Sequence, residues 1–193
     1  MEIVNRVAVS DIETFDLEAL WDGRPIATFD LAGFLVEGLV LREKPFREAL
    51  TSHDWSLYDG RHVAVTLSTD AIVPTWAYLL VASRLHGRAA SVAFGSETDL
   101  VRDFFVRALE GVDWSTYADK PVVVKGCGSG IVPTDAYLIA VGKLQAVAKK
   151  LMYGEPCSSV PLWRRKEGVV ASDGAAAKPA RPVGIKPAGP PRA

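Results

Sequence analysis

Short apolar runs alternate with longer amphipathic stretches along most of the chain. Runs of strand length, several of them rich in valine, occur at 26–29, 62–67, 91–94, 121–125 and 150–153. A continuous apolar run of this length is typical of a β-strand that is covered on both faces. Apolar residues at helical spacing predict helices at 31–41, 46–52, 75–86, 134–147 and between 96 and 111. Strands that alternate with helices indicate an α/β protein.

Capping residues and prolines predict where several of these helices begin and end. Ser96 and Asp99 have the spacing of a capping box, in which each side chain satisfies the backbone N–H of the other residue. Asp30 is expected to cap the helix that runs from Leu31 to about Leu41. Pro45 is expected to separate that helix from the next, because proline interrupts a helix interior.

An internal repeat is the strongest pattern in the chain. Residues 54–95 align with residues 113–154 without a gap, and 16 of the 42 aligned positions are identical. The longest identical blocks are Asp-Trp-Ser at 54 and 113, Ile-Val-Pro-Thr at 72 and 131, and Ala-Tyr-Leu at 77 and 136. We call residues 54–95 the first unit and residues 113–154 the second unit. Each unit predicts a β-α-β arrangement, so we expect a three-layer domain with a mostly parallel sheet of about five strands.

The last 26 residues differ in composition from the rest of the chain. Alanine, proline and glycine occupy 16 of the positions 168–193, and no aromatic residue occurs there. Such a segment buries too little apolar surface to offset the entropy of ordering, so we expect a disordered tail. The whole chain carries a formal charge of −1, and the tail has four cationic residues and one aspartate. The α/β domain, residues 1–167, therefore carries −4.

Composition excludes several classes of protein. A net charge of −1 provides no basic surface of the kind that binds nucleic acid or an anionic membrane. Two cysteines cannot form a disulfide scaffold. Glu2 stands where a signal peptide would be basic and then apolar, and the apolar stretch 71–83 is too short to span a bilayer. We expect a cytoplasmic protein with no membrane and no nucleic-acid partner.

Both cysteines follow predicted strands of the second unit. Cys127 comes after the strand 121–125, and Cys157 follows the strand that begins at 150, close to Glu155. Ligands of α/β sheets bind beyond the carboxyl ends of the strands, and thiolates are the ligands that zinc and iron–sulfur species prefer. Cys127, Cys157 and Glu155 are therefore candidate metal ligands. Two alternatives stay open: a single reactive thiol in the loop, or two cysteines that serve as small apolar core residues.

A glycine-rich loop follows the same strand. Lys125, Gly126, Gly128, Ser129 and Gly130 are candidate cofactor-binding residues, because a strand, a glycine-rich loop and a helix in this order can cradle a phosphate. The glycine spacing matches neither the Walker A motif nor the dinucleotide-binding motif, so a plain strand-to-helix turn is the alternative interpretation.

Two further features are assigned to the surface. The basic run Trp163-Arg164-Arg165-Lys166 is interpreted as a solvated terminus. His62 corresponds to Pro121 of the second unit, and we expect it at the surface or at a sheet edge.

Several segments together resemble a known family. They are Glu2–Val7, Phe15–Leu17, Glu37–Leu39, Leu41–Lys44, His53–Ser56, Asp70–Pro74, Trp76–Tyr78, Lys125–Cys127 and Met152–Ser158. In these segments, which span about residues 2–166, the chain resembles the bacterial domain-of-unknown-function family numbered 2480. Members of that family are often encoded beside genes of the SUF iron–sulfur assembly system. The resemblance implies a role near iron–sulfur maturation, with iron–sulfur assembly proteins as partners.

The sequence thus leaves three functional hypotheses. The first is an accessory protein that binds a metal or an iron–sulfur species, with iron, an iron–sulfur cluster or zinc as the candidate cofactor. The second is a small thiol-dependent or nucleotide-binding α/β enzyme that uses the loop 125–130. The third is an interaction module without a small-molecule site.

Overall fold

The structure, a computed structural model, describes residues 12–126, 128–155 and 158–166, and the tail 168–193 lies outside them. The described strands are β1 (Glu13–Asp16), β2 (Ile26–Asp30), β3 (His62–Thr66), β4 (Ser91–Phe94), β5 (Pro121–Lys125), β6 (Lys150–Glu155) and β7 (Ser158–Arg164). The described α-helices are α1 (Glu43–Ser52), α2 (Thr75–Leu85), α3 (Glu97–Glu110) and α4 (Thr134–Val147). Among these segments, no helix is of a length and apolarity that would cross a bilayer.

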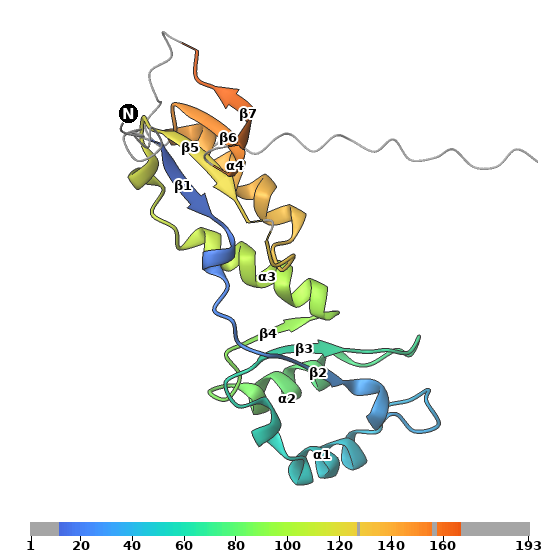
Figure 1. Cartoon of the computed structure of the whole chain (residues 1–193). Coiled ribbons are helices and arrows are strands. Elements are labelled where there is room, and N and C mark those ends of the chain that lie inside the picture. The colour runs from blue at the N-terminus through green and yellow to red at the C-terminus, as the bar shows by residue number, and fades with distance from the viewer. Residues whose placement is uncertain (1–11, 127, 156–157, 167–193) are drawn as a thin grey trace, which may run out of the picture.

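The strands form two sheets (Figure 1). The three-stranded sheet has the order β2-β3-β4, and the four-stranded sheet has the order β1-β5-β6-β7. All pairs are parallel except β6 with β7. The predicted α/β class with mostly parallel strands is confirmed. The single sheet of about five strands is corrected to two sheets, because each unit adds a strand of its own from the N-terminal part of the chain.

The two N-terminal strands share a short sequence that the alignment of the units does not contain. Thr-Phe-Asp-Leu occurs at Thr14–Leu17 and again at Thr28–Leu31. Phe15 of β1 pairs with Val124 of the second unit, and Phe29 of β2 pairs with Val65, the aligned residue of the first unit. The two strands therefore occupy the same position in their sheets.

Two separate stretches of the chain contribute strands to the four-stranded sheet. The chain begins there with β1, builds the whole three-stranded sheet with β2, β3 and β4, and returns for β5, β6 and β7. Figure 1 shows the two crossings, one between β1 and β2 and one through α3. Within the units, both contain a 3-10 turn, a strand, a helix and a strand in this order. Their duplication stays an inference from the sequence.

Helix α3 lies between the two sheets. On one face of the three-stranded sheet, Val63 and Val65 pack with the buried side chains of α1 and α2. On the opposite face, the ring of His62 contacts Phe104 of α3, and α3 also contacts α4 (Figure 1). Three layers are thus present around this sheet. Phe105 of α3 belongs to the core of the four-stranded sheet, so the helix that covers this face of the three-stranded sheet is part of the core of the other sheet.

The predicted helix between Leu31 and Leu41 is wrong. Only Leu31–Phe34 forms a short 3-10 helix, which Asp30 caps at the N–H of Ala32. Glu37 and Gly38 both have positive φ, and this turn reverses the chain so that Val36 bridges Val40. Positive φ is incompatible with a continuing right-handed helix.

Other predicted boundaries agree closely with the structure. Helix α4 and strands β4 and β5 have the predicted bounds, and the Ser96–Asp99 capping box of α3 is present. Pro45 lies inside α1 rather than before it. Its position in the first helical turn explains why it is tolerated, since no intrahelical partner is lost there.

Candidate functional site

The carboxyl edge of the four-stranded sheet collects most of the candidate residues. Strands β1, β5 and β6 are parallel neighbours, so their carboxyl ends meet at this edge. Asp16, Lys125 and Glu155 are the last residues of these three strands. The structure therefore brings Lys125, a predicted loop residue, close to Glu155, a predicted metal ligand, and adds Asp16 to them.

Lys125 lies between two carboxylates. Its ammonium is 3.4 Å from Asp16 Oδ2 and 3.8 Å from Glu155 Oε1. Attraction from Glu155, and then from Asp16, raises the pKa of the Lys125 ammonium above its usual value. Lys125 is therefore a permanent cation at this edge of the sheet.

The glycine-rich loop binds a carboxylate of the same chain, that of Glu18. Glu18, in the short 3-10 helix after β1, accepts hydrogen bonds from Ser129 N at 2.5 Å and from Ser129 Oγ at 2.9 Å. The backbone N–H of Ser129, then its hydroxyl, and further the N–H of Gly128 lower the pKa of the Glu18 carboxyl. Glu18 is thus ionised at neutral pH and occupies the amides that would face a phosphate.

Close contacts with neighbouring residues explain why glycine occupies two positions of this loop. Gly126 has a φ of +148°, and a Cβ there would lie 2.9 Å from Leu17 Cβ. Its carbonyl accepts a hydrogen bond from the Tyr137 hydroxyl. A Cβ at Gly128 would lie 3.1 Å from Glu18 Oε2. The loop is shaped to fit Glu18 and Leu17, which argues against the nucleotide-binding alternative.

The first unit places a carboxylate at the equivalent loop. Asp30, at the end of β2, accepts hydrogen bonds from Ser68 N at 3.1 Å and from Ala32 N at 2.9 Å. Burial alone would raise the pKa of Asp30, but the hydrogen bonds from Ser68 and Ala32 outweigh it and hold the pKa below its usual value. The sequence predicts Asp30 only as a helix cap and does not predict Glu18, because the repeated Thr-Phe-Asp-Leu segment aligns Asp30 with Asp16 and not with Glu18.

We expect Glu18→Gln to destabilise the protein at pH 7. In this variant a neutral amide replaces the carboxylate, so the hydrogen bonds from Ser129 and Gly128 lose their charge assistance, and one of the two accepting oxygens becomes an NH2 group that only donates. Because folding lowers the pKa of Glu18 below its usual 4.5, its stabilising effect is full above that pH and disappears as the pH falls through the folded pKa. Thermal melts of both proteins should therefore differ at pH 7 and converge toward pH 3. A constant difference between the melts would contradict this linkage.

Cys127 and Cys157 themselves lie outside the described residues. The structure shows where the neighbouring strands end: Lys125 closes β5 and Glu155 closes β6, two residues before each cysteine. Glu155 and Ser158 pair with each other across β6 and β7. In the part of the chain that the structure describes, no three His, Cys, Asp or Glu side chains cluster as metal ligands. A metal site at this edge therefore depends on the two thiols.

His62 is buried and not at the surface, although it does lie at the amino edge of its sheet, the other position that the sequence predicts. It is 2% exposed, and its ring shares a hydrogen bond of 2.7 Å with Ser91 Oγ and one of 2.8 Å with Asp22 Oδ1. The prediction of a surface position failed because Pro121, its counterpart in the second unit, provided no sign of a polar partner. This Asp22-His62-Ser91 chain lies at the amino end of β3 and β4, away from the loops after the strands.

Comparison with known proteins identifies the family. Searches of the curated proteins and of the solved structures returned no significant match. A family model described as protein of unknown function, DUF2480, matches residues 1–165. The match covers both sheets and the carboxyl edge with Lys125 and Glu155. The chain therefore belongs to the DUF2480 family.

Proposed function

We propose that this protein is a non-enzymatic accessory protein that binds a soft metal ion or an iron–sulfur species through Cys127 and Cys157. The observation that carries the proposal is the strand order. Strands β5 and β6 are hydrogen-bonded neighbours, and each ends two residues before a cysteine. Adjacent strands lie about 4.8 Å apart, so both loops leave the sheet from one small area.

The chemistry of the donors fits such a species. Two thiolates and the carboxylate of Glu155 provide three anionic donors, and zinc or iron takes four ligands in a tetrahedral site. The ion pair between Lys125 and Glu155 is 3.8 Å long and both side chains are partly exposed. Exposed pairs of this kind contribute only about 0–1 kcal/mol, so Glu155 can leave Lys125 at little cost. The family resemblance adds an iron–sulfur assembly protein as the expected partner.

The test is metal and sulfide analysis of protein purified without oxygen. We expect bound zinc, iron or iron with sulfide in the wild type. Cys127→Ser and Cys157→Ser should each lower the metal content at least about tenfold, because a hydroxyl is a poor ligand for these ions. Glu155→Gln should lower it less. Glu48→Gln, an exposed change on α1, is the matched control and should leave the metal content unchanged.

Two outcomes would overturn the proposal. One is a wild-type protein that neither contains metal nor binds added zinc or ferrous iron. The other is a metal content in both serine variants that equals that of the wild type. In that case, alkylation rates against pH decide between the alternatives: a Cys127 thiol with a pKa well below about 8.5 supports a thiol-dependent enzyme, and two unreactive thiols support an interaction module.

A further inference from the structure

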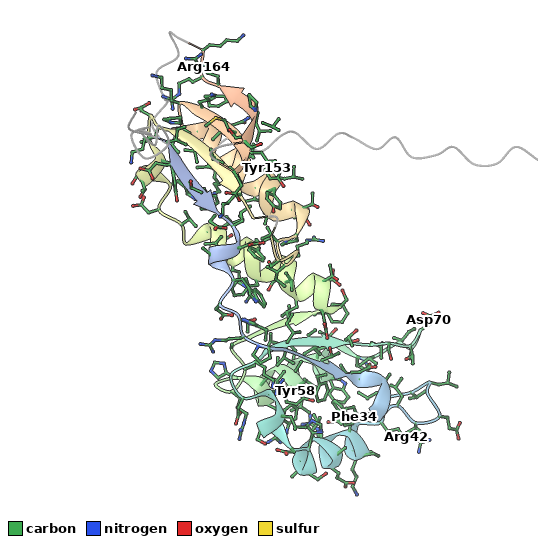
Figure 2. The ribbon with its side chains drawn as sticks, viewed as in Figure 1. Phe34, Arg42, Tyr58, Asp70, Tyr153 and Arg164 are labelled. Carbon is green, nitrogen blue, oxygen red and sulfur yellow. The ribbon has the colours of Figure 1, made fainter. Side chains whose placement is uncertain are left out.

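A pocket lies at the amino edge of the four-stranded sheet, at the opposite ends of the strands from the loops that carry the cysteines. Its volume is about 610 Å³. Six charged residues line it, namely Glu13, Asp119, Lys120, Lys149, Lys150 and Arg164. Figure 2 shows Arg164 at the end of β7, with Tyr153 of β6 below it. This volume is within the range of about 300–1,000 Å³ that is usual for small-molecule sites.

The cations in this pocket outnumber the anions. Lys120 Nζ pairs with Glu13 Oε1 at 2.8 Å, and Asp119 pairs with Arg165 just outside the lining. Both carboxylates of the pocket are therefore already neutralised. Within residues 12–126, 128–155 and 158–166, no carboxylate forms an ion pair with Lys149, Lys150 or Arg164.

Two of these three cations lie directly opposite each other on neighbouring strands. Lys150 and Arg164 are direct partners in the antiparallel pairing of β6 and β7. Like charges at directly opposite positions destabilise a sheet. The backbone around them is fixed by hydrogen bonds, since Lys149 N donates to Lys120 O at 2.9 Å and Arg165 N donates to Lys149 O at 3.0 Å. The sheet thus holds repelling cations on a rigid frame.

The fold does not require these charges. At the aligned positions of the first unit, Ala90 and Ser91 replace Lys149 and Lys150. There the amino edge of the sheet is closed by the hydrogen-bonded chain of His62 with Ser91 and Asp22. Lys149 and Lys150 are therefore specific to the second unit, in a domain whose net charge is negative.

We infer that this pocket binds a small oxyanion with two or more negative charges. Lysine and arginine side chains bind phosphate and carboxylate oxygens through charge-assisted hydrogen bonds, and arginine does so in a bidentate manner. An anion placed between Lys149, Lys150 and Arg164 removes their mutual repulsion and gives each of them a partner. Arg164 of the basic run at 163–166 is thus part of a site, whereas the sequence interpretation assigned the whole run to a solvated terminus. This inference is independent of the thiols.

Isothermal titration of the full chain at low salt, with inorganic pyrophosphate and with citrate as probes, tests the inference. Lys150→Gln and Arg164→Gln should each weaken binding by about tenfold or more, since one charge-assisted hydrogen bond is worth roughly that factor. Lys143→Gln, an exposed lysine change on α4 outside the lining, is the control and should bind as the wild type does. Stronger binding of pyrophosphate assigns a phosphate ligand, and stronger binding of citrate assigns a carboxylate ligand.

The melting temperature without ligand provides a second measurement. Lys150→Gln should melt at the same or a higher temperature than the wild type at low salt, because the repulsion from Arg164 is relieved. A loss of binding in this variant then reflects the site and not the fold. The inference is overturned if the wild type binds neither probe at millimolar concentration. It is also overturned if the pocket variants bind as the wild type does, or if Lys143→Gln loses as much affinity as they do.

Discussion

Phe105→Ala is expected to lower the free energy of unfolding by about 3–5 kcal/mol, the range found for large-to-small changes of buried phenylalanines. Phe105 is fully buried in α3 and packs edge to face with Phe104. Its ring also lies parallel to that of Trp21, with centroids 6.3 Å apart. Truncation leaves a cavity in the layer that joins the two sheets, where neighbouring elements are held from both sides and cannot easily close it.

Chemical denaturation and amide hydrogen exchange measure this effect. Because α3 contacts β2, β3 and β4 and also α4, exchange should accelerate in β3 of one sheet and in β5 of the other. Phe94→Ala is the matched control, since Phe94 is 68% exposed, and it should cost well under half as much. Acceleration in β5 alone would contradict the role of α3 as a layer that packs against both sheets.

The elements that the sequence predicts best are those whose signals are local. Helix α4 shows its apolar face at helical spacing, and the strands 91–94 and 121–125 are short apolar runs with clear ends. The cap of α3 depends on two residues three positions apart. Each of these features can be predicted from a short stretch of the sequence, because long-range contacts do not alter its bounds.

The division into two sheets depends on contacts that no local window contains. Strand β1 has only four residues and pairs with β5, which follows about a hundred residues later. Strand β1 pairs with the second unit, yet it comes before β2, which pairs with the first unit. A single shift of the sequence therefore cannot align all the repeated parts. The helix predicted after Asp30 failed for a local reason, the positive φ of Glu37 and Gly38.

In the candidate site, too, the residues with a local sequence signal were predicted and those that depend on long-range contacts were not. Sequence analysis assigned Lys125 and Glu155 to two separate candidate sites at the ends of strands of one unit, and the structure places their side chains 3.8 Å apart. It did not find Glu18, whose hydrogen bond to Ser129 spans 111 positions. An acidic residue among many has no local sign of such a role. The equivalent Thr-Phe-Asp-Leu segments make Asp16 and Asp30 predictable as acidic strand ends, but Glu18 corresponds to Ala32 and so has no such sign.

His62→Ala is expected to lower the free energy of unfolding by about 2–4 kcal/mol. Two hydrogen bonds are lost, each worth about 1 kcal/mol, and the removed ring leaves a cavity of comparable cost. The ring lies 4.9 Å from that of Trp21 and 5.1 Å from that of Phe104, measured between centroids. Through its bond to Asp22, His62 also holds the connection between β1 and β2 against the three-stranded sheet.

Thermal denaturation of three histidine variants separates the contributions of packing and hydrogen bonding. For a chain of this length, each kcal/mol lowers the melting temperature by about 2–4 °C. His62→Phe keeps most of the volume and loses only the hydrogen bonds, so its loss should be about half that of His62→Ala. His86→Ala, an exposed change at the end of α2, should be within about 0.5 kcal/mol of the wild type. If His62→Ala matched His86→Ala, the hydrogen-bonded chain from Asp22 through His62 to Ser91 would contribute nothing to stability. A loss in His62→Phe equal to that in His62→Ala would instead assign the stability to the hydrogen bonds and none of it to packing against Trp21 and Phe104.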